Sequence, residues 1–268
     1  MKAWPLILAG VLLTSACAHP PERNAVVAHA EALTQRAAQA YAKGDLATAR
    51  NNYSSALRLY ESLADSEGRA RTLLSLARVT AQAGKPMDAR AEIEALLAEP
   101  GPLDPATRLT AHGRAAGLAL TIGDTQAAQR HLDQAATLCT APCPDGAPLT
   151  VLRARVRLTE GKAAEALTLA DKVVADSAHA GSEHGNALRV RAQALAALGK
   201  HREATEAATL ALGFDQKRGR SELVILDLQL LAQAHQALGA PEIARRYQTL
   251  ADRARAARRD LLGGGAEE

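Results

Sequence analysis

The sequence predicts an all-α solenoid of about six helix-turn-helix repeats. The first observation is a spacing of 38 to 40 residues between six glycines: Gly44, Gly84, Gly123, Gly161, Gly199 and Gly239. The second is an alanine seven residues before each glycine: Ala37, Ala77, Ala116, Ala154, Ala192 and Ala232. The third is an alanine five residues after each: Ala49, Ala89, Ala128, Ala166, Ala204 and Ala244. A fixed period of this size is typical of stacked structural repeats.

Each unit is expected to be two helices joined at its glycine. Glycine suits the end of the first helix because the chain there often adopts a left-handed conformation. The second helix can then begin with a suitable residue. Asp45 and Asp124 follow a glycine directly and can cap the helix. Pro86 and Pro241 stand near a helix start, where a missing N–H is tolerated.

The alanines are expected where the two helices of a unit cross, because a larger side chain there would force the helices apart. The position seven residues beyond the second alanine returns to the same helix face. It is apolar in every unit: Ala56, Leu96, Ala135, Val173, Ala211 and Ala251. Links between units are predicted from breaker and polar residues at 100–102, 142–148, 176–182 and 213–219.

These residues resemble the tetratricopeptide repeat (TPR) family, in which two antiparallel helices meet through small residues with glycine in the turn. The resemblance covers residues 30–255 and implies a right-handed solenoid with a concave groove. Two features depart from the family pattern. The period exceeds the usual length of about 34 residues, and Ala, Leu or Thr replaces most of the motif's aromatics, Tyr53 being the best retained.

The first residues of the chain read as a targeting segment. Lys2 precedes an apolar run over residues 6–13, which is too short to span a bilayer and is typical of a signal peptide. No other stretch of the sequence is long and apolar enough to cross a membrane. Residues 13–17, LTSAC, resemble the lipobox of bacterial lipoproteins. An ordinary secretory signal with an incidental cysteine is the alternative.

The lipoprotein resemblance implies cleavage after residue 16 and lipidation of Cys17. Ala18 next to the anchor, in place of Asp, implies a periplasm-facing position on the bacterial outer membrane, with the lipid as the only membrane contact. The predicted organisation is a signal peptide at 1–16, a lipid-anchored tether with the start of the first helix at 17–29, the repeat domain at 30–255, and the end of the last helix with a disordered tail at 256–268.

Cys139 and Cys143 form a C-x3-C pair at the end of the third unit. In an oxidising envelope compartment a disulfide is expected. The loop is short, so its effect on stability is modest, on the order of 2 kcal/mol. Free thiols are an alternative. A redox or metal role is disfavoured, because the spacing is not C-x-x-C and two further ligands are not visible nearby.

Several classes of function are disfavoured by composition. The net charge of +3 and an aromatic content of 2% argue against a nucleic-acid binder, which would need a basic footprint and stacking rings. No catalytic or nucleotide-binding motif occurs, and the eight histidines are scattered. We therefore expect no catalytic residue, no metal and no cofactor.

The TPR resemblance assigns the groove to one face of each first helix. Carried over by spacing, this face comprises Tyr41, Arg71, Arg78, Arg155, Arg189, Gln193, Gln229 and Gln233. Its arginines would make the groove basic, and arginine suits bidentate capture of carboxylates. The expected ligand is an acidic peptide segment or chain terminus. The alternative is an ordinary solvated face.

Four arginines, Arg253, Arg255, Arg258 and Arg259, cluster near the end of the last predicted helix. We interpret them as favourable charges near the negative end of the helix dipole rather than as a binding patch.

The sequence thus favours a lipid-anchored interaction scaffold that holds an envelope protein through its groove. Similar repeat lipoproteins act in pilus assembly, outer-membrane assembly and the organisation of cell-wall enzymes. Two other classes remain open: a small-ligand-binding protein or enzyme on the same array, and a structural spacer. A deep pocket with shifted ionisable groups would favour chemistry, whereas an open polar surface would favour a protein partner.

Replacement of the proposed lipidated cysteine, Cys17→Ala, is expected to release the protein from membranes, because multiple acyl chains are what hold it there. Fractionation of cells into membrane and soluble material measures this. The matched control is Cys139→Ala, which leaves the anchor intact. Continued membrane attachment of Cys17→Ala would rule out the lipoprotein assignment.

Overall fold

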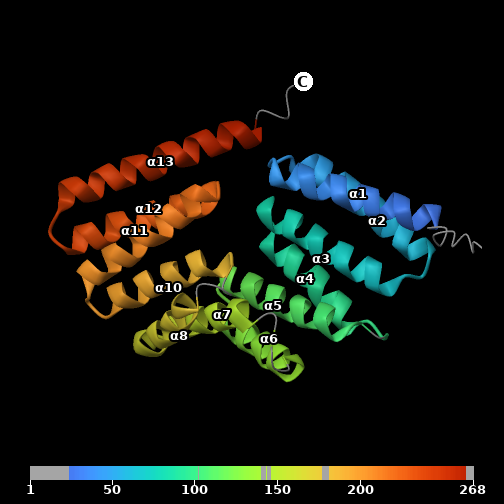
Figure 1. Ribbon diagram of the computed structural model, residues 1–268, viewed down its shortest axis with the longest axis horizontal. Helices are drawn as coiled ribbons and strands as arrows, with labels where there is room; N and C mark the ends of the chain where they lie inside the picture. The colour runs from blue at the N-terminus through green and yellow to red at the C-terminus, as the bar shows by residue number, and fades with distance from the viewer. Residues whose placement is uncertain (1–23, 102, 140–142, 144–145, 177–180, 264–268) are drawn as a thin grey trace, which may run out of the picture.

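The structure is a computed structural model that describes residues 24–101, 103–139, 143, 146–176 and 181–263. Within these ranges all regular secondary structure is helical (Figure 1). No helix among them is long and apolar enough to cross a membrane. The proposed signal peptide and Cys17 lie outside the described residues, so their assignment stays a prediction.

The described helices form six consecutive pairs, as the glycine spacing predicts. Their bounds are α1 Ala25–Ala42 and α2 Leu46–Ser62; α3 Ser66–Gln82 and α4 Pro86–Ala98; α5 Pro105–Thr121 and α6 Thr125–Leu138; α7 Gly146–Thr159 and α8 Ala163–Ala175; α10 Glu183–Ala197 and α11 His201–Lys217; α12 Ser221–Ala237 and α13 Pro241–Gly263. The prediction of an all-α solenoid of helix-turn-helix units is confirmed.

The first helices of the units form the inner wall of the array. Each helix packs against its neighbour along the chain, and α3, α5, α7, α10 and α12 also contact one another in that order. The array curves so strongly that its two ends return toward each other. The C-terminal end of α1 and the C-terminal part of α13 face each other across the centre of the molecule (Figure 1).

The repeated glycines end the first helices as predicted. All six have a positive φ, between 74° and 85°, a conformation that costs little without a Cβ. The predicted caps also form. The Asp45 carboxylate accepts a hydrogen bond from the Thr48 amide at 2.9 Å, and that of Asp124 accepts one from the Ala127 amide at 2.9 Å. Pro86 and Pro241 begin α4 and α13.

The repeated alanines are the centre of the packing. All twelve are buried, the least so being Ala232 at 7% exposed. The apolar position seven residues further on is buried in every unit as well. Clusters of these alanines with leucine, isoleucine and valine follow one another along the array instead of forming a single central core.

Two predicted links differ from the structure. Residues 213–219 were expected to be irregular, but α11 continues through Gly213 to Lys217. One glycine costs a helix only about 1 kcal/mol, and the adjacent Asp215 is fully buried in an ion-paired cluster that holds this turn. The link predicted at 142–148 is shorter than expected because α7 already begins at Gly146.

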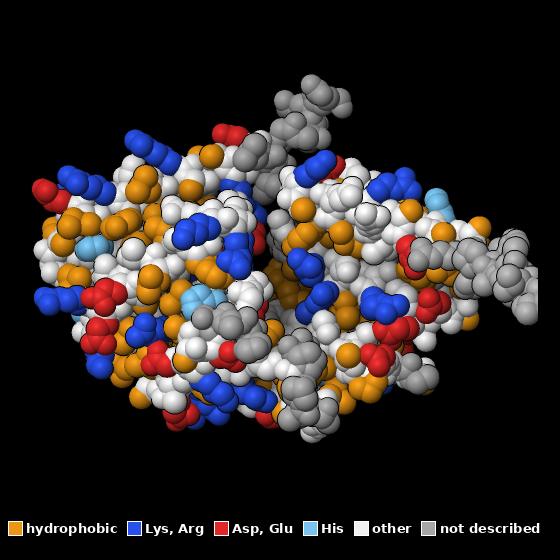
Figure 2. All heavy atoms as spheres, in the orientation of Figure 1, with side chains coloured by type: hydrophobic (Ala, Val, Ile, Leu, Met, Phe, Trp, Pro, Cys, Tyr) orange, Lys and Arg blue, Asp and Glu red, His pale blue; other side chains and the backbone are white. Residues whose placement is uncertain are grey.

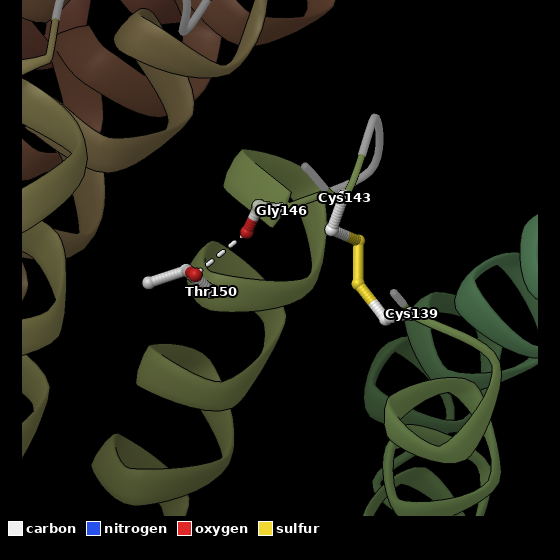
Figure 3. The surroundings of a disulfide bond; sticks show 4 residues. All are labelled: Cys139, Cys143, Gly146 and Thr150. Atoms are coloured by element: carbon white, nitrogen blue, oxygen red, sulfur yellow. Dashed lines mark hydrogen bonds between the residues drawn. A yellow bond between two sulfur atoms is a disulfide. The ribbon is translucent and has the colours of Figure 1, made fainter. Parts of the chain in front are cut away.

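Cys139 and Cys143 are joined by a disulfide in the structure, with their Cα atoms 5.2 Å apart, an ordinary separation (Figure 3). Cys139 is the C-terminal cap of α6, and the Gly146 amide at the start of α7 donates a hydrogen bond to the Cys143 carbonyl at 3.1 Å. The pair therefore lies at the junction of the third and fourth units. Its oxidation in the native compartment stays a prediction.

Overpacking a helix crossing should destabilise the array. Ala166 is completely buried in α8, so Ala166→Phe is expected to lower the free energy of unfolding by about 1–3 kcal/mol or more. Thermal unfolding followed by circular dichroism measures this. The control is Ala164→Phe, two residues away and exposed, which should leave the midpoint nearly unchanged. Equal midpoints for both variants would contradict the crossing assignment.

Candidate functional site: a basic central cavity

A cavity of about 450 Å³ lies at the centre of the curved array. It is lined by the inner faces of α3, α5 and α7, by Tyr41 of α1, and by Glu222 and Arg258 from the last unit. Figure 2 shows the hollow between the two ends of the array, with Lys and Arg side chains on both sides and hydrophobic side chains at its floor. The volume is in the range of small-molecule and peptide-anchor sites.

The cavity carries a strong excess of positive charge. Four arginines line it, Arg78, Arg114, Arg155 and Arg258, against a single carboxylate, Glu222. That carboxylate is already paired with Arg258, at 3.0 Å between Nη2 and Oε2. Such a cleft between low-dielectric walls concentrates field lines and attracts anions.

Arg155 occupies the central place. It lines this cavity and two adjoining ones. Among the described residues its half-buried guanidinium makes no hydrogen bond or ion pair. Burial lowers the pKa of Arg155, the positive charge of Arg189 lowers it further, and Glu183 acts the other way. An arginine keeps its charge at neutral pH, so an anionic ligand would offset the cost of holding that charge here.

Arg78 and Tyr41 form one wall of the cavity. The Arg78 guanidinium carbon lies 4.8 Å from the centre of the Tyr41 ring, a cation–π contact. Arg78 is exposed, and its contact with the ring leaves the guanidinium N–H groups able to bind an anion. Arg114 of α5 donates a hydrogen bond to the Leu74 carbonyl of α3, which fixes its direction.

A second opening of about 510 Å³ continues the cavity between the two ends of the array. Its basic residues are Lys43 and Arg78 on one side and Arg220 and Arg258 on the other. The excess of positive charge therefore extends from the walls of the cavity to its mouth.

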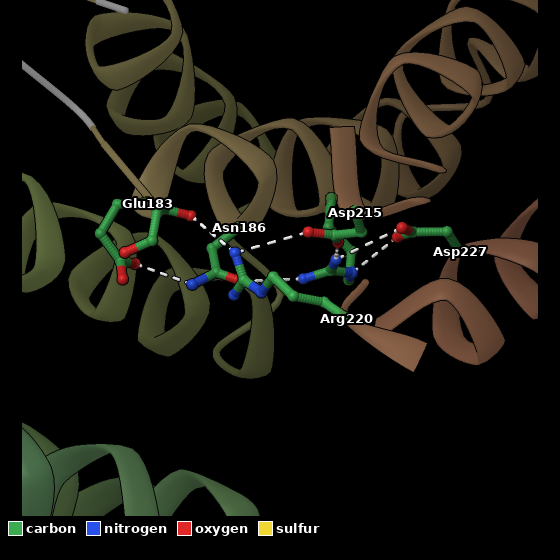
Figure 4. Close-up of polar contacts among 7 residues, drawn as sticks. Glu183, Asn186, Asp215, Arg220 and Asp227 are labelled. Carbon is green, nitrogen blue, oxygen red and sulfur yellow. Dashed lines mark hydrogen bonds and ion pairs between the residues drawn. The ribbon is translucent and has the colours of Figure 1, made fainter. Parts of the chain in front are cut away.

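Arg189 lies beside this cavity, but its charge is paired with carboxylates in the protein interior. Its side chain is buried and forms ion pairs with Asp215 and with Asp227, the latter at 2.7 Å (Figure 4). It also donates to the Asn186 side chain at 2.9 Å. Both aspartates are completely buried. The cluster joins α10, α11 and α12, so it fixes the fifth unit against the sixth.

The two aspartates affect each other through this cluster. Burial raises the pKa of Asp227 to about 6, from an ordinary value of 3.8. Arg189 opposes the rise through its hydrogen bond and its charge, and the neighbouring Asp215 adds to it. Arg220, at 3.4 Å from Asp215, supplies a second positive charge.

A second polar cluster lies between α5 and α6. The Nδ1 atoms of His112 and His131 are 3.1 Å apart, and Nε2 of His131 lies 3.2 Å from the Glu94 carboxylate. Burial lowers the pKa of His112 to about 4, with His131 and Arg108 contributing in the same direction. Within the described ranges no group of three or more His, Cys, Asp or Glu side chains is arranged to hold a metal ion.

The structure brings five of the eight residues that spacing assigned to the groove to the central cavity or to those that adjoin it. Tyr41, Arg78 and Arg155 line the central cavity, and Gln193 lines the adjoining ones. Arg189 lines one adjoining cavity, with its charge already paired. Three others lie outside the lining of these four cavities: Arg71, which is exposed and 3.9 Å from Glu67, and Gln229 and Gln233. Ligand binding by these residues stays a prediction.

The repeat spacing did not select the residues that reach the cavity from other positions of their helices. Arg114 stands three residues before the corresponding groove position, Gly117, and Arg258 and Glu222 enter only because the array curves back on itself. The dipole interpretation of the C-terminal arginines was wrong, because α13 continues to Gly263 and its last turn holds no basic residue. Arg255 and Arg258 instead pair with Asp252 and Glu222.

No protein-family model and no curated protein matches this chain. Solved structures do. The chain is similar to a Rap protein complexed with Competence and Sporulation Factor, at 16% identity and a TM-score of 0.71, over 88% of this chain and 66% of that one. The fold is a TPR-like solenoid.

Two further structures are similar over more of their length. BtubC (BKLC) from P. vanneervenii is 14% identical with a TM-score of 0.50, over 87% of this chain and 92% of that one. A tetratricopeptide repeat protein from Parabacteroides merdae ATCC 43184 is 15% identical with a TM-score of 0.49, over 88% and 98%. Identities this low speak to the fold alone.

Asp227 and His112, whose pKa values are shifted in opposite directions, should make the free energy of unfolding depend on pH with opposite slopes. Asp227, with its raised pKa, binds a proton more tightly when folded, so its contribution is lost as pH rises from about 4 to 6. His112, with its lowered pKa, binds one less tightly, so its contribution is lost as pH falls from 6.5 to about 4.

Between pH 4 and 7, Asp227→Asn is therefore expected to make the unfolding midpoint rise more steeply with pH than in the parent chain. His112→Gln is expected to make it rise less steeply or fall. Thermal unfolding in matched buffers measures both slopes. His29→Gln, an exposed histidine on α1, is the control. Parallel curves for all four proteins would contradict both assignments.

Proposed function

We propose that the protein is a lipid-anchored, periplasm-facing interaction scaffold that binds an acidic segment of an envelope protein in its basic central cavity. The observation that carries the proposal is the charge of the cavity: four arginines face one carboxylate, which is already paired. Arg155, half-buried at the centre, forms no ion pair or hydrogen bond among the described residues, although the charge of Glu183 acts on it.

The spread of the charge favours an extended ligand. Arg78, Arg155 and Arg258 belong to α3, α7 and α13, and the basic mouth adds Lys43 and Arg220. One small anion could engage only part of this surface. A peptide chain with several carboxylates could engage it at successive positions, and guanidinium groups suit bidentate binding to each.

The same geometry disfavours an enzyme. The groups with strongly shifted pKa values, Asp227 and His112, belong to packed clusters between helices. The residues that line the central cavity are arginines, one paired glutamate, glutamine, tyrosine, glycine and apolar side chains. This set offers anion binding, with no general base poised near neutral pH.

The proposed location in the cell envelope rests on the targeting segment and on the lipobox-like residues that end at Cys17. An anchored scaffold gains from confinement to a membrane surface, because the anchor raises the local concentration of partners on the same membrane. The similarity to a Rap protein complexed with Competence and Sporulation Factor shows that a fold of this shape also occurs in a complex with another molecule.

The proposal is tested by crosslinking in intact envelopes. A photo-crosslinking residue in place of Gln82, which lines the cavity, is introduced into the parent chain and into a double variant, Arg78→Glu with Arg155→Glu. The parent chain is expected to crosslink to a protein segment rich in Asp and Glu, identified by mass spectrometry. The double variant should lose at least 90% of that product, because two attractive sites become repulsive.

The control is a second double variant, Arg202→Glu with Arg245→Glu, which has the same net charge and alters exposed arginines outside the cavities. It should crosslink as the parent chain does, and circular dichroism confirms that all variants are folded. Equal crosslinking by both double variants would overturn the proposal. A small metabolite in place of a protein would favour the ligand-binding alternative.

A further inference from the structure

Two glycines within α5 are not explained by packing. Gly68 and Gly185, in other helices, leave room for aromatic rings, since an added Cβ at either position would collide with the ring of Tyr60 or of Phe214. At Gly113 and Gly117 the nearest atom to an added Cβ is a leucine methyl at 3.6 Å, an ordinary contact. Alanine would fit both positions, and helix propensity favours it.

Gly117 differs from Gly113 in one respect: it lines the central cavity. It stands six residues before the turn glycine of its unit. At this position the second, fourth, fifth and sixth units have Arg78, Arg155, Gln193 and Gln233. The third unit, at the middle of the curved wall, therefore presents bare backbone between Arg78 and Arg155.

The floor around Gly117 is apolar. Ala77, Ala81, Ile93 and Leu118 line the cavity with it, whereas the arginines surround this floor. The hollow in Figure 2 shows the same arrangement, with hydrophobic side chains at the bottom and basic ones at the sides. A ligand that fills it must combine negative charge with a bulky apolar group.

We propose that Gly117 opens a subsite for one large apolar side chain of the bound segment, flanked on that segment by carboxylates. This rests on the proposed function and specifies its ligand: an acidic peptide with a buried Phe, Trp or Leu between its acidic residues. An amphipathic anion with a single carboxylate, such as a fatty acid, satisfies the floor but offers only one negative charge to the basic side chains that extend from Arg155 to the mouth. The distribution of charge thus favours the peptide.

The test uses the full-length chain in detergent and five labelled, end-blocked peptides in which two glutamates precede and two follow a variable residue: Gly, Ala, Leu, Phe or Trp. Fluorescence anisotropy gives each Kd. For the parent chain the Phe or Trp peptide is expected to bind at least tenfold more tightly than the Gly peptide. Gly117→Ala should weaken the Phe peptide about tenfold, and Gly117→Leu should abolish the preference.

Gly113→Ala and Gly113→Leu are the matched controls, on the same helix but away from the cavity, and should leave every Kd unchanged. Both alanine variants should raise the unfolding temperature by about 2–4 °C. A loss of binding in Gly117→Ala, a more stable protein, would therefore come from the subsite and not from unfolding.

The outcomes separate this inference from the proposed function. Binding that is lost in the Arg78→Glu, Arg155→Glu variant, yet is independent of the variable residue and of Gly117, would overturn the subsite and leave the acidic-segment proposal standing. No arginine-dependent binding of any peptide would overturn both. Binding of dodecanoate, blocked by Gly117→Leu, without binding of the peptides would overturn the assignment to a peptide.

Discussion

The whole structure depends on helices that cross at alanine. Aromatic residues are 2% of the chain, so the core is made of small and aliphatic side chains, and helices that meet through alanine approach closely. The side chains at a contact set the distance between helices and the angle at which they cross. The repeated crossing turns each unit relative to the last, and six such units bring α13 back to face α1. The central cavity is a consequence of this geometry.

The cluster of Arg189, Asp215 and Asp227 is a buried ionic exception to this apolar packing. Buried ion pairs often add little net stability, because desolvation offsets the attraction, but loss of one partner is costly. Here the charges belong to three helices of adjacent units, so they hold the fifth unit against the sixth in one arrangement. The sixth unit supplies Arg258 and Glu222 to the cavity. A buried contact thus positions a wall of the proposed binding site.

The central cavity combines two properties: an excess of positive charge and an apolar floor in which Gly117 has no side chain. Arg155 remains charged in a half-buried place, at an energetic cost visible in its lowered pKa. Gly117 forgoes the helix stability that alanine would supply. Neither feature serves the packing of the described residues. Both fit the proposed ligand, which carries negative charge and a bulky apolar group.

The sequence by itself determined the repeat. Glycine at a turn and alanine at a crossing are local steric requirements, and they recur at a visible period, so helices, caps and buried positions could be predicted. The same period placed Tyr41, Arg78 and Arg155 on the inner wall. It could not show that Arg189 would pair with Asp215 and Asp227, nor that Arg258 would reach the first units. Those outcomes depend on the cumulative rotation between units, which is set by many small packing contacts, and only the tertiary structure decided them.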